Sequence, residues 1–576
     1  MTDTLLLFTF SPIQSFIAEA RRAQDLFMGS RILSRLAEAA GKAIGEENLV
    51  YPAPKHHDAP NMLVACISED QISSKIVNIN EAMNSVWNNY AHNARKTMKD
   101  LGVLTDPTWE EIWETQTKPF WQVYWATALI KENDYKTAYN TARIILDAVK
   151  RSRLFDDIEP EGGRKDSLSG KRSALHTKDY PDARKYWAQV TDPKTTKIFA
   201  SKVRPFGKEM LDAIGAVKRF SESEPFLSTS SIASAEYLGR VKENSPKALE
   251  LYRNALREQF SGANKLFEPR KDSDPDWPFD SDLLYMEMLT IKRLKDDYGV
   301  EADKAKLDVC RKTLEQVYRA PLLANPKEKL GEPSKYYSIL LMDGDNMRKH
   351  IDGLLNGNDP KTAHENFSKA IGSFSDIAPS KITREFLIYN GGDDVLCALP
   401  LVHAVPKAQD LADNFKRLTK NTASVGIAIV HHQSPLDAAL DAARDAEEGA
   451  KHVSGKNALC VHALKRSGET LKVRSGWDGV KANFDALVNM FKADELSSRF
   501  AYDTKQSSYA IPIGGKMWQA ELKRLVGRHR DDMKGPDPMK LSEQLNQWTK
   551  GLPDQSTEEL GSWLILARFI AQGGGE

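Results

Sequence analysis

Tyr389-Asn390-Gly391-Gly392-Asp393-Asp394 is the stretch that decides the fold of this chain. Two apolar runs flank it, residues 385–389 before and 395–400 after, and each has about the length of a buried strand. Because Asn-Gly-Gly tolerates positive φ, the pattern predicts a β-hairpin whose tip carries two adjacent carboxylates. Adjacent carboxylates repel each other, so a cation is expected beside them. Mg²⁺ is the expected ion because it prefers oxygen ligands.

A second acidic segment lies upstream. Residues 336–342 form an apolar run that predicts a strand with Asp343 at its end. We expect Asp345 or Asn346 to cap the helix that begins near Met347. The free N–H groups at the start of that helix would then form an anion site suited to a nucleotide triphosphate.

The two acidic segments lie in the order strand, helix, strand, GGDD turn, strand, helix, strand, which is typical of a ferredoxin-like palm. This order places Asp343 beside the hairpin that carries Asp393 and Asp394. Three carboxylates in that position are expected to hold two metal ions, Mg²⁺ or Mn²⁺, for an in-line displacement at phosphorus. Either segment alone is also explained by an acidic turn that caps a helix, and it is their combination that favours a catalytic metal site.

The same motifs resemble a known family. YYSILLMDGDNM (336–347), YNGGDDVLCALP (389–400) and FSPIQSFIAEARRAQDLFMGSRILS (10–34) are similar to the palm signatures of the large subunit of type III CRISPR effector complexes, especially the type III-B (Cmr) branch. The resemblance implies synthesis of cyclic oligoadenylates from ATP when the complex binds target RNA. It also implies other Cmr protein subunits and a guide CRISPR RNA as partners.

The resemblance further implies nucleotide contacts in this GGDD-bearing palm. In palm-type cyclases a lysine that follows the helix predicted at residues 435–451 reaches the triphosphate, although a solvated helix end explains the lysines here nearly as well. The residues expected to bind nucleotide are Gly344, Asp345, Asn346, Gly391, Gly392, Lys451 and Lys456.

Residues 1–131 repeat the palm order, with a long amphipathic helix from Ile13 towards Ile44 that we expect to be interrupted near Gly29-Ser30. Phe10-Ser11-Pro12-Ile13-Gln14 replaces the Asp-Gly-Asp motif and Pro60-Asn61 replaces GGDD, so this first palm lacks metal-binding carboxylates. Strands are expected at residues 4–10, 49–51, 62–67 and 120–130. Some residues of this palm could still bind a second nucleotide, although helix capping and surface pairing explain them equally well. They are Ser11, Gln14, Arg22, Asp25, Gly29 and Ser30.

The composition is that of a protein with several domains. The chain has 576 residues, and Lys+Arg and Asp+Glu both number 80, so the net charge is zero. A freestanding nucleic-acid binder is usually more basic, which favours a subunit that leaves most backbone contacts to partners. The four cysteines form no CxxC pair and suit a reducing cytoplasm. No leader or transmembrane run is visible, so we expect a cytoplasmic protein without a membrane partner.

We expect an α+β chain with two ferredoxin-like palms and helical regions between and after them. Related large subunits carry a zinc-binding loop with cysteine pairs between the palms, and the similar stretch here, residues 165–171, has no cysteine. Either the zinc has been lost or other contacts hold the loop, so no zinc is expected. The expected domains are 1–131, first palm; 132–335, mostly helical; 336–470, catalytic palm; and 471–576, C-terminal helical domain. A basic cluster in the last domain, suited to a protein or RNA partner or simply to solvent, comprises Lys516, Lys523, Arg524, Arg528 and Arg530.

Many such subunits also carry an N-terminal HD nuclease domain, which needs dispersed histidines and aspartates on helices. Here His57-Asp58 is the only such dipeptide, so we expect this chain to lack the HD nuclease. Two alternatives to the cyclase stay open. One is a catalytically silent scaffold subunit, and the other is a palm synthase that makes a different adenylate or a diguanylate-type signal.

Overall fold

The computed structural model divides into two compact units, which are described separately below. Unit 1 comprises Met1–Pro333 and Asp352–Gly372, and unit 2 comprises Ser334–Ile351 and Ser373–Glu576. The residues that the structure describes are 3–54, 60–152, 161–192, 195, 198, 202–222, 226–260, 276–511, 515–553 and 557–575.

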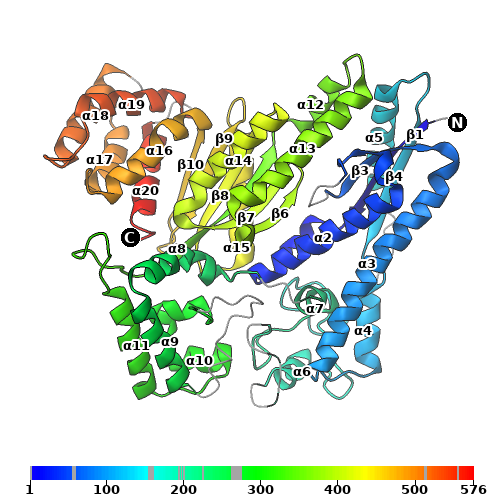
Figure 1. Ribbon diagram of the computed structural model, residues 1–576, viewed down its shortest axis with the longest axis horizontal. Coiled ribbons are helices and arrows are strands. Elements are labelled where there is room, and N and C mark those ends of the chain that lie inside the picture. Colours follow the sequence, from blue (N-terminus) through cyan, green and yellow to red (C-terminus); the bar gives the residue numbers. More distant parts are fainter. Residues whose placement is uncertain are drawn as a thin grey trace. The chain divides into compact units, whose positions relative to one another are not determined.

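Unit 1 contains a four-stranded antiparallel sheet of order β2-β3-β1-β4 (Figure 1). Its strands are β1 (Asp3–Ser11), β2 (Leu49–Tyr51), β3 (Met62–Ser68) and β4 (Gln122–Leu129). The apolar run of β1 is buried from Thr4 to Phe10, as expected of a strand that has a neighbour on both sides and is covered on its faces. The four strands predicted for the first palm are therefore confirmed, as is the α+β class of the chain.

Helices make up most of the rest of unit 1, in agreement with the helical patterns of residues 132–335. The first palm carries α1 (Gln14–Ala18), α2 (Ala23–Ile44), α3 (Ile72–Asp100) and α4 (Pro107–Thr117). The region that follows carries α5 (Tyr135–Arg151), α6 (Ala183–Val190), α7 (Ala213–Phe220), α8 (Thr229–Asn244), α9 (Pro246–Gln259), α10 (Ile291–Tyr298) and α11 (Lys304–Tyr318).

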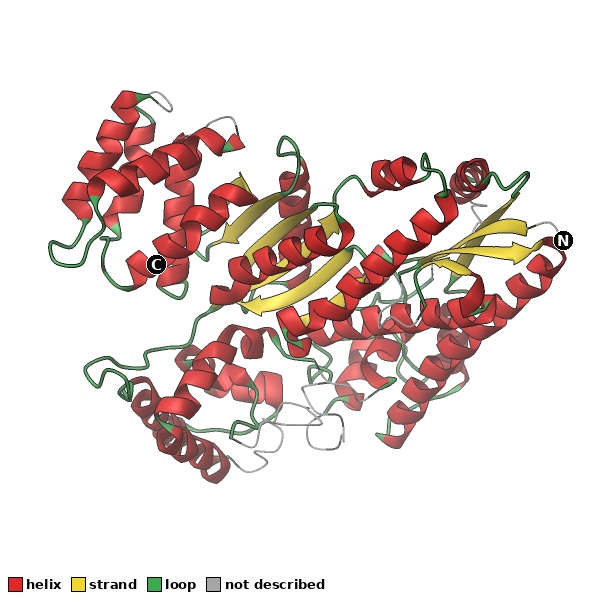
Figure 2. Cartoon of the chain, turned by 45° about the horizontal axis from the view of Figure 1, so that its top comes forward, coloured by secondary structure: helices red, strands yellow, loops and turns green. Residues whose placement is uncertain are grey.

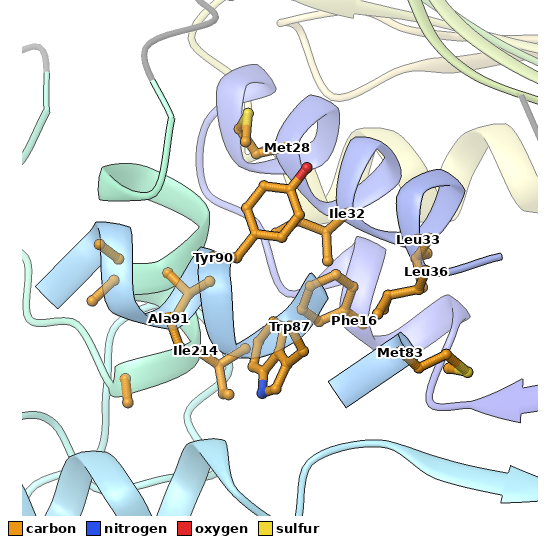
Figure 3. Packing of buried hydrophobic residues seen from close by; sticks show 14 of the residues in the cluster. Phe16, Met28, Ile32, Leu33, Leu36, Met83, Trp87, Tyr90, Ala91 and Ile214 are labelled. Carbon is orange, nitrogen blue, oxygen red and sulfur yellow. The ribbon is translucent and has the colours of Figure 1, made fainter. Parts of the chain in front are cut away.

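A large core cluster of unit 1 lies where α1, α2, α3 and α7 meet (Figure 3). Trp87 of α3 is 1 % exposed and lies with Phe16 and Ile214 at the centre of the view, while its indole N–H donates to the Thr117 carbonyl at 2.8 Å. A buried indole of this kind contributes a large apolar area and satisfies its one donor. The cluster joins the segment around residues 209–220 to the first palm as one core.

The first long helix does not break where the sequence indicates. Gly29-Ser30 lies inside α2, and the interruption is at residues 19–22, between α1 and α2. The reason is a polar contact from α7: the Lys218 ammonium binds the carbonyl of Phe16 and, at 2.8 Å, that of Glu19, so carbonyls that a continuous helix would use internally have another partner. Asp25 accepts from the backbone N–H groups of residues 21 and 22 at 3.0 and 3.1 Å and fixes the new start.

A buried ion cluster follows from that arrangement. The Arg219 guanidinium binds the Asp25 carboxylate at 2.7 and 2.8 Å and the Glu209 carboxylate at 2.7 Å, and all three side chains are at most 2 % exposed. Burial alone would raise the pKa of Asp25, but Arg219 outweighs it and holds that pKa below its ordinary value. Loss of one partner would leave a buried charge uncompensated, so a single substitution in this cluster should strongly destabilise the fold.

Unit 2 is built on a six-stranded sheet of order β10-β9-β8-β5-β7-β6, seen as the larger set of strands in Figure 2. Every neighbouring pair is antiparallel except β8 and β9, which are parallel and joined through α15 (Leu436–Lys451). The strands are β5 (Tyr336–Gly344), β6 (Leu387–Gly391), β7 (Asp394–Pro400), β8 (Ala423–His431), β9 (Ala458–Leu464) and β10 (Thr470–Gly476).

Helices of the palm precede and follow the hairpin of β6 and β7. They are α12 (Met347–Leu354) and α13 (Pro360–Ile382), each with residues in both units, and α14 (Ala404–Thr419). The order from β5 to β8 is that predicted for the palm. The sheet extends further than expected, because β10 pairs with β9, and residues 471–476 of β10 lie within the expected C-terminal helical domain.

The C-terminal part is helical, as predicted, with α16 (Trp477–Lys492), α17 (Arg499–Ser508), α18 (Lys516–His529), α19 (Pro538–Gly551) and α20 (Thr557–Ala571). Trp518, Trp548 and Trp563 are at most 3 % exposed and form its core. The basic side chains predicted as a cluster lie along α18 and at its end, and Arg524 is paired with Glu521 at 2.8 Å. None of the helices in the described ranges is long and apolar enough to cross a bilayer.

We predict that His364 makes unit 1 sensitive to acid. This histidine is 2 % exposed, its Nδ1 lies 3.0 Å from the Tyr135 hydroxyl, and burial lowers its pKa from 6.5 to about 4. Between these two values the unfolded chain binds a proton that the folded chain does not, so stability is complete above pH 6.5 and falls as the pH drops towards 4. The loss reaches about 3 kcal/mol, since one pKa unit corresponds to about 1.4 kcal/mol.

Urea denaturation at several buffered pH values between 7 and 4 measures the free energy of unfolding at each pH. His364→Gln should flatten the pH dependence because it keeps a hydrogen-bonding side chain but does not titrate. His92→Gln, at an exposed position of α3, is the matched control and should leave the curve unchanged. Identical pH dependence in the wild type and His364→Gln would contradict the prediction.

Candidate active site

The antiparallel pairing of β5 with β7 and β8 brings the two acidic motifs together. Met342 pairs with Val395 of β7, and the next residue, Asp343, pairs with Ser424 of β8. Asp394 is the first residue of β7 and pairs with Gly391 of β6 across a two-residue turn. The end of β5 therefore lies beside the tip of the GGDD hairpin, as the sequence predicts.

Asp343, Asp393 and Asp394 offer carboxylate oxygens that all lie within 4.8 Å of one another. Among the described residues, no other group of three or more histidine, cysteine, aspartate or glutamate side chains comes this close together. Burial, together with the nearby Asp343 carboxylate, raises the pKa of Asp393 to about 6. An all-oxygen donor set with this crowding of negative charge fits a hard divalent cation such as Mg²⁺.

Glycines allow this close approach. A Cβ on Gly344 would lie 2.8 Å from the Met347 sulfur and 3.0 Å from the Asp393 Cβ. A Cβ on Gly391 would overlap the Tyr389 hydroxyl, at 1.7 Å. Gly392 has φ +87°, which suits the first turn position of a tight hairpin and would strain any other residue. The three glycines are thus required for packing or for backbone conformation.

Lys451 supplies a positive charge at the acidic cluster. Its ammonium lies 2.6 Å from Asp343 and also pairs with Glu447, one turn earlier on α15. Burial alone would lower the pKa of Lys451, but these two carboxylates outweigh it and raise that pKa, so the lysine is charged at neutral pH. The structure therefore places Lys451 beside Asp343, while its contact with a nucleotide stays a prediction.

Gly426 is a contributor that the sequence analysis missed. It lies in the middle of β8, and a Cβ there would be only 2.1 Å from the backbone nitrogen of Glu447. The backbone of α15 therefore lies directly against β8 at this point, which fixes the height of Glu447 and Lys451 above the sheet. A glycine inside a strand pattern is the sequence signal that would have indicated such a close contact.

Asn390 is a second residue that was missed. Its side chain is completely buried, and its amide N–H donates to the Ser375 carbonyl of α13 at 2.6 Å. No periodic pattern in the sequence indicates that Asn390 reaches α13, so only the folded chain reveals this contact. Asn390 anchors the strand that leads into the GGDD turn.

Of the two residues predicted to cap the helix that begins at Met347, Asn346 takes the cap position and Asp345 does not. The Asp345 carboxylate does not cap a helix: it is 1 % exposed and accepts hydrogen bonds from Thr422 and Ser424, at 2.8 and 2.7 Å, and from the Asn457 backbone N–H at 2.9 Å. It therefore ties the start of β8 to the loop after α15, which also contains Lys456. Asn346, at φ +49°, takes the cap position through its backbone carbonyl, which accepts from the His350 N–H.

The nucleotide-binding residues proposed for the first palm lie in unit 1 with different accessibilities. Gln14 is exposed and Ser11 is partly exposed. Arg22 is partly exposed and pairs with Glu209 at 3.4 Å. The remaining three, Asp25, Gly29 and Ser30, are buried, and the Asp25 carboxylate is occupied by Arg219.

The loop at residues 165–171, where related subunits are expected to bind zinc, is held by hydrogen bonds. The Asp166 carboxylate is buried and accepts from the backbone N–H groups of Leu168 and Ser169, at 2.7 and 2.6 Å, and from the Ser169 hydroxyl at 2.6 Å. Lys165 and Ser173 form a bridge across its base. The Asp166 carboxylate thus stabilises the turn of this loop through hydrogen bonds of the kind that a bound metal would otherwise replace.

A palm sheet with a cluster of three aspartates at a hairpin defines a palm domain with a candidate metal site. Comparison with known proteins agrees with this class: residues 336–460 match the family model "Cas10/Cmr2, second palm domain", and residues 5–101 match "CRISPR-associated protein Cmr2, N-terminal". The chain is 24% identical to the CRISPR system Cmr subunit Cmr2 of Pyrococcus furiosus, over 92% of this chain and 70% of that protein.

Two solved structures have a similar fold. One is the apo state of the type III-B Cmr-beta complex, with a TM-score of 0.66 and 12% identity, and the match covers 100% of this chain and 82% of that chain. The other is type III-B Cmr-beta bound to cognate target RNA, with a TM-score of 0.67 and 11% identity, covering 100% and 83%. The resemblance to the large palm-domain subunit of type III-B complexes is confirmed.

We predict that Gly344→Ala weakens metal binding at the three aspartates. The added methyl group must displace Met347 or the Asp393 side chain, and overpacking of this kind costs about 1–3 kcal/mol. Because this cost falls on the geometry in which the aspartates bind metal, the affinity for Mn²⁺ should drop by about fivefold to a hundredfold. Titration followed by the electron paramagnetic resonance signal of free Mn²⁺ measures it.

Gly353→Ala, in α12, is the matched control because a Cβ there meets nothing within 4 Å. It should leave Mn²⁺ affinity unchanged and slightly favour the helix. Equal Mn²⁺ affinity in Gly344→Ala and Gly353→Ala would show that the close approach at Gly344 does not matter for the metal site.

Proposed function

We propose that this chain is a nucleotidyl cyclase that converts ATP to cyclic oligoadenylates. The observation that carries the proposal is the convergence of Asp343, Asp393 and Asp394 within a domain that matches the Cas10/Cmr2 second palm. Rigid strands and a tight turn hold these carboxylates, so the site is preorganised for charge stabilisation. ATP is the proposed substrate, in line with the family resemblance.

The proposed setting is a type III-B effector complex, in which guide CRISPR RNA and target RNA are bound through the assembly and target binding activates synthesis. Two observations support it: the similarity to Cmr2, and the match of the whole chain to a protein whose structures include the apo and target-RNA-bound states. The zero net charge of the chain is consistent with RNA contacts made mostly by other subunits.

The proposed cofactor is a pair of Mg²⁺ or Mn²⁺ ions held by the three aspartates. Divalent ions at such a site would activate an attacking hydroxyl and neutralise charge on the transferred phosphate and the leaving pyrophosphate. The aspartates contribute by holding negative oxygen ligands in one place. Gly344 contributes by leaving room for Asp393, and Gly391 by leaving room for the Tyr389 ring beside the turn.

The other residues have distinct proposed tasks. Lys451, whose charged ammonium lies at the three aspartates, would bind triphosphate oxygens, and Lys456 in the next loop would assist. Asp345 keeps that loop against β8 through Asn457. In the first palm, Ser11, Gln14 and Arg22 keep accessible surface for a second nucleotide, whereas Asp25 would act indirectly by shaping the segment that carries Arg22.

We predict that replacing Asp393 and Asp394 together with Ala abolishes product formation while the protein still folds. Metal and electrostatic contributions are each worth several kcal/mol, and about 1.4 kcal/mol is tenfold in rate, so synthesis should fall by several orders of magnitude. Removal of mutually repelling carboxylates from a turn leaves no cavity, so stability should be kept. Asp343→Ala should act similarly.

The experiment incubates the reconstituted complex with ATP, Mg²⁺ and target RNA and identifies products by mass spectrometry. Asp441→Ala is the matched control, because Asp441 is an exposed aspartate of α15 that pairs only with Arg444 among the described residues. Near-normal ATP turnover in the folded double variant would show that this palm is not the active site, and it would favour the hypothesis that the chain is a catalytically silent scaffold subunit. A different nucleotide product would favour the alternative synthase.

A further inference from the structure

A cleft of about 590 Å³ lies in unit 2 over the outer strands β9 and β10. The helices α15 and α20 contribute its walls, and in Figure 1 the labels β9 and β10 mark its strands. Asp445 and Glu448 of α15, and His452 directly after it, line this cleft, whereas Glu447 and Lys451 lie at the acidic cluster. The cleft is therefore distinct from the candidate active site, and its volume is in the range of ligand sites.

The floor of the cleft contains a buried histidine that makes no hydrogen bond with any described residue. His462 of β9 is 6 % exposed and pairs in register with Lys472 of β10, while Cys460 pairs with Arg474. All four of these residues line the cleft. A buried imidazole normally has a hydrogen-bond partner, so its ring nitrogens at a cleft wall indicate a position for a ligand atom.

The charges around His462 favour a cation. Four carboxylates and two cationic side chains line the cleft, and Arg474 is engaged by Glu559, whose carboxylate also accepts from the Arg474 N–H at 2.6 Å. Asp445 and Glu448, three residues apart on one face of α15, have no ion pair or side-chain hydrogen bond with the described residues. A phosphate or another anion would be repelled by this excess of negative charge, so an anionic ligand is not favoured.

A metal ion is not favoured either. In the described part of the chain, the three aspartates of the palm are the only side chains close enough to share one ion, and the cleft residues do not meet that condition. The required ligand is therefore a cation that carries several hydrogen-bond donors spread over a few ångströms. A guanidinium has this shape, because its planar fork presents five N–H donors to carboxylates and other acceptors.

We propose that this cleft binds an arginine side chain of a protein partner, with the guanidinium between Asp445 and Glu448 and one N–H donated to a ring nitrogen of His462. The surroundings of His462 support this role, because burial and the neighbouring Lys472 lower its pKa, and Asp445 opposes that shift only in part. The ring is then neutral at pH 7 and has a nitrogen that accepts. Arg–carboxylate contacts of this kind are among the stronger hydrogen bonds in proteins.

The test uses the full chain and the probe N-acetyl-arginine methylamide, without ATP, so that its outcome is independent of the proposed cyclase activity. NMR titration follows the imidazole signals of His462, assigned with His462→Gln. We expect saturable shifts of these signals. The citrulline analogue, which keeps the shape of the probe without its charge, should bind the wild type at least about tenfold more weakly. The arginine probe should bind the double variant Asp445→Asn/Glu448→Gln more weakly by a similar factor.

Asp441→Asn is the matched control: it also removes a carboxylate from α15, but outside the cleft, and should bind the probe like the wild type. Three results would each overturn the proposal. These are no saturable shift of the His462 signals in the wild type, equal binding of arginine and citrulline, and unchanged binding by the double variant when its folding is confirmed by the same spectra.

Discussion

The antiparallel register of β5 with β7 is the constraint on which the candidate site depends. It brings Asp343 beside the hairpin tip, and the absence of a side chain at Gly344 lets the two backbones come close enough for three carboxylates to share one region. Such crowding is unfavourable by itself, as the raised pKa of Asp393 indicates. The strands and the turn of the palm hold these like charges together against their repulsion.

Local signals in the sequence were sufficient for this arrangement. A strand pattern that ends in an aspartate and a hairpin turn of Asn-Gly-Gly each predict their own geometry, and the palm order then predicts that they meet. The contacts of Asn390 with Ser375, and of Gly426 with Glu447, were not predicted because they depend on how neighbouring elements pack against each other, which leaves no periodic pattern in the sequence. Asp345 was misjudged for another reason, since its partners Ser424 and Asn457 lie far along the chain.

The break in the first helix has a similar cause. Glycine and serine at residues 29 and 30 are weak helix formers, but tertiary packing overrides such preferences. The stronger determinant is Lys218 on α7, which takes backbone carbonyls before α2, together with the ion cluster of Arg219, Asp25 and Glu209. Residues 209–220, whose chemistry the sequence does not reveal, thereby shape the segment that holds the nucleotide-binding residues proposed for the first palm.

Lys451 gives the acidic cluster a positive neighbour that belongs to the chain itself. Because its ammonium already lies at Asp343, part of the carboxylate repulsion is relieved by the polypeptide alone. This built-in positive charge is present whether or not divalent ions are bound. The polypeptide thus carries its own partial counterion, and the folded arrangement of the three aspartates does not depend on metal alone for charge compensation.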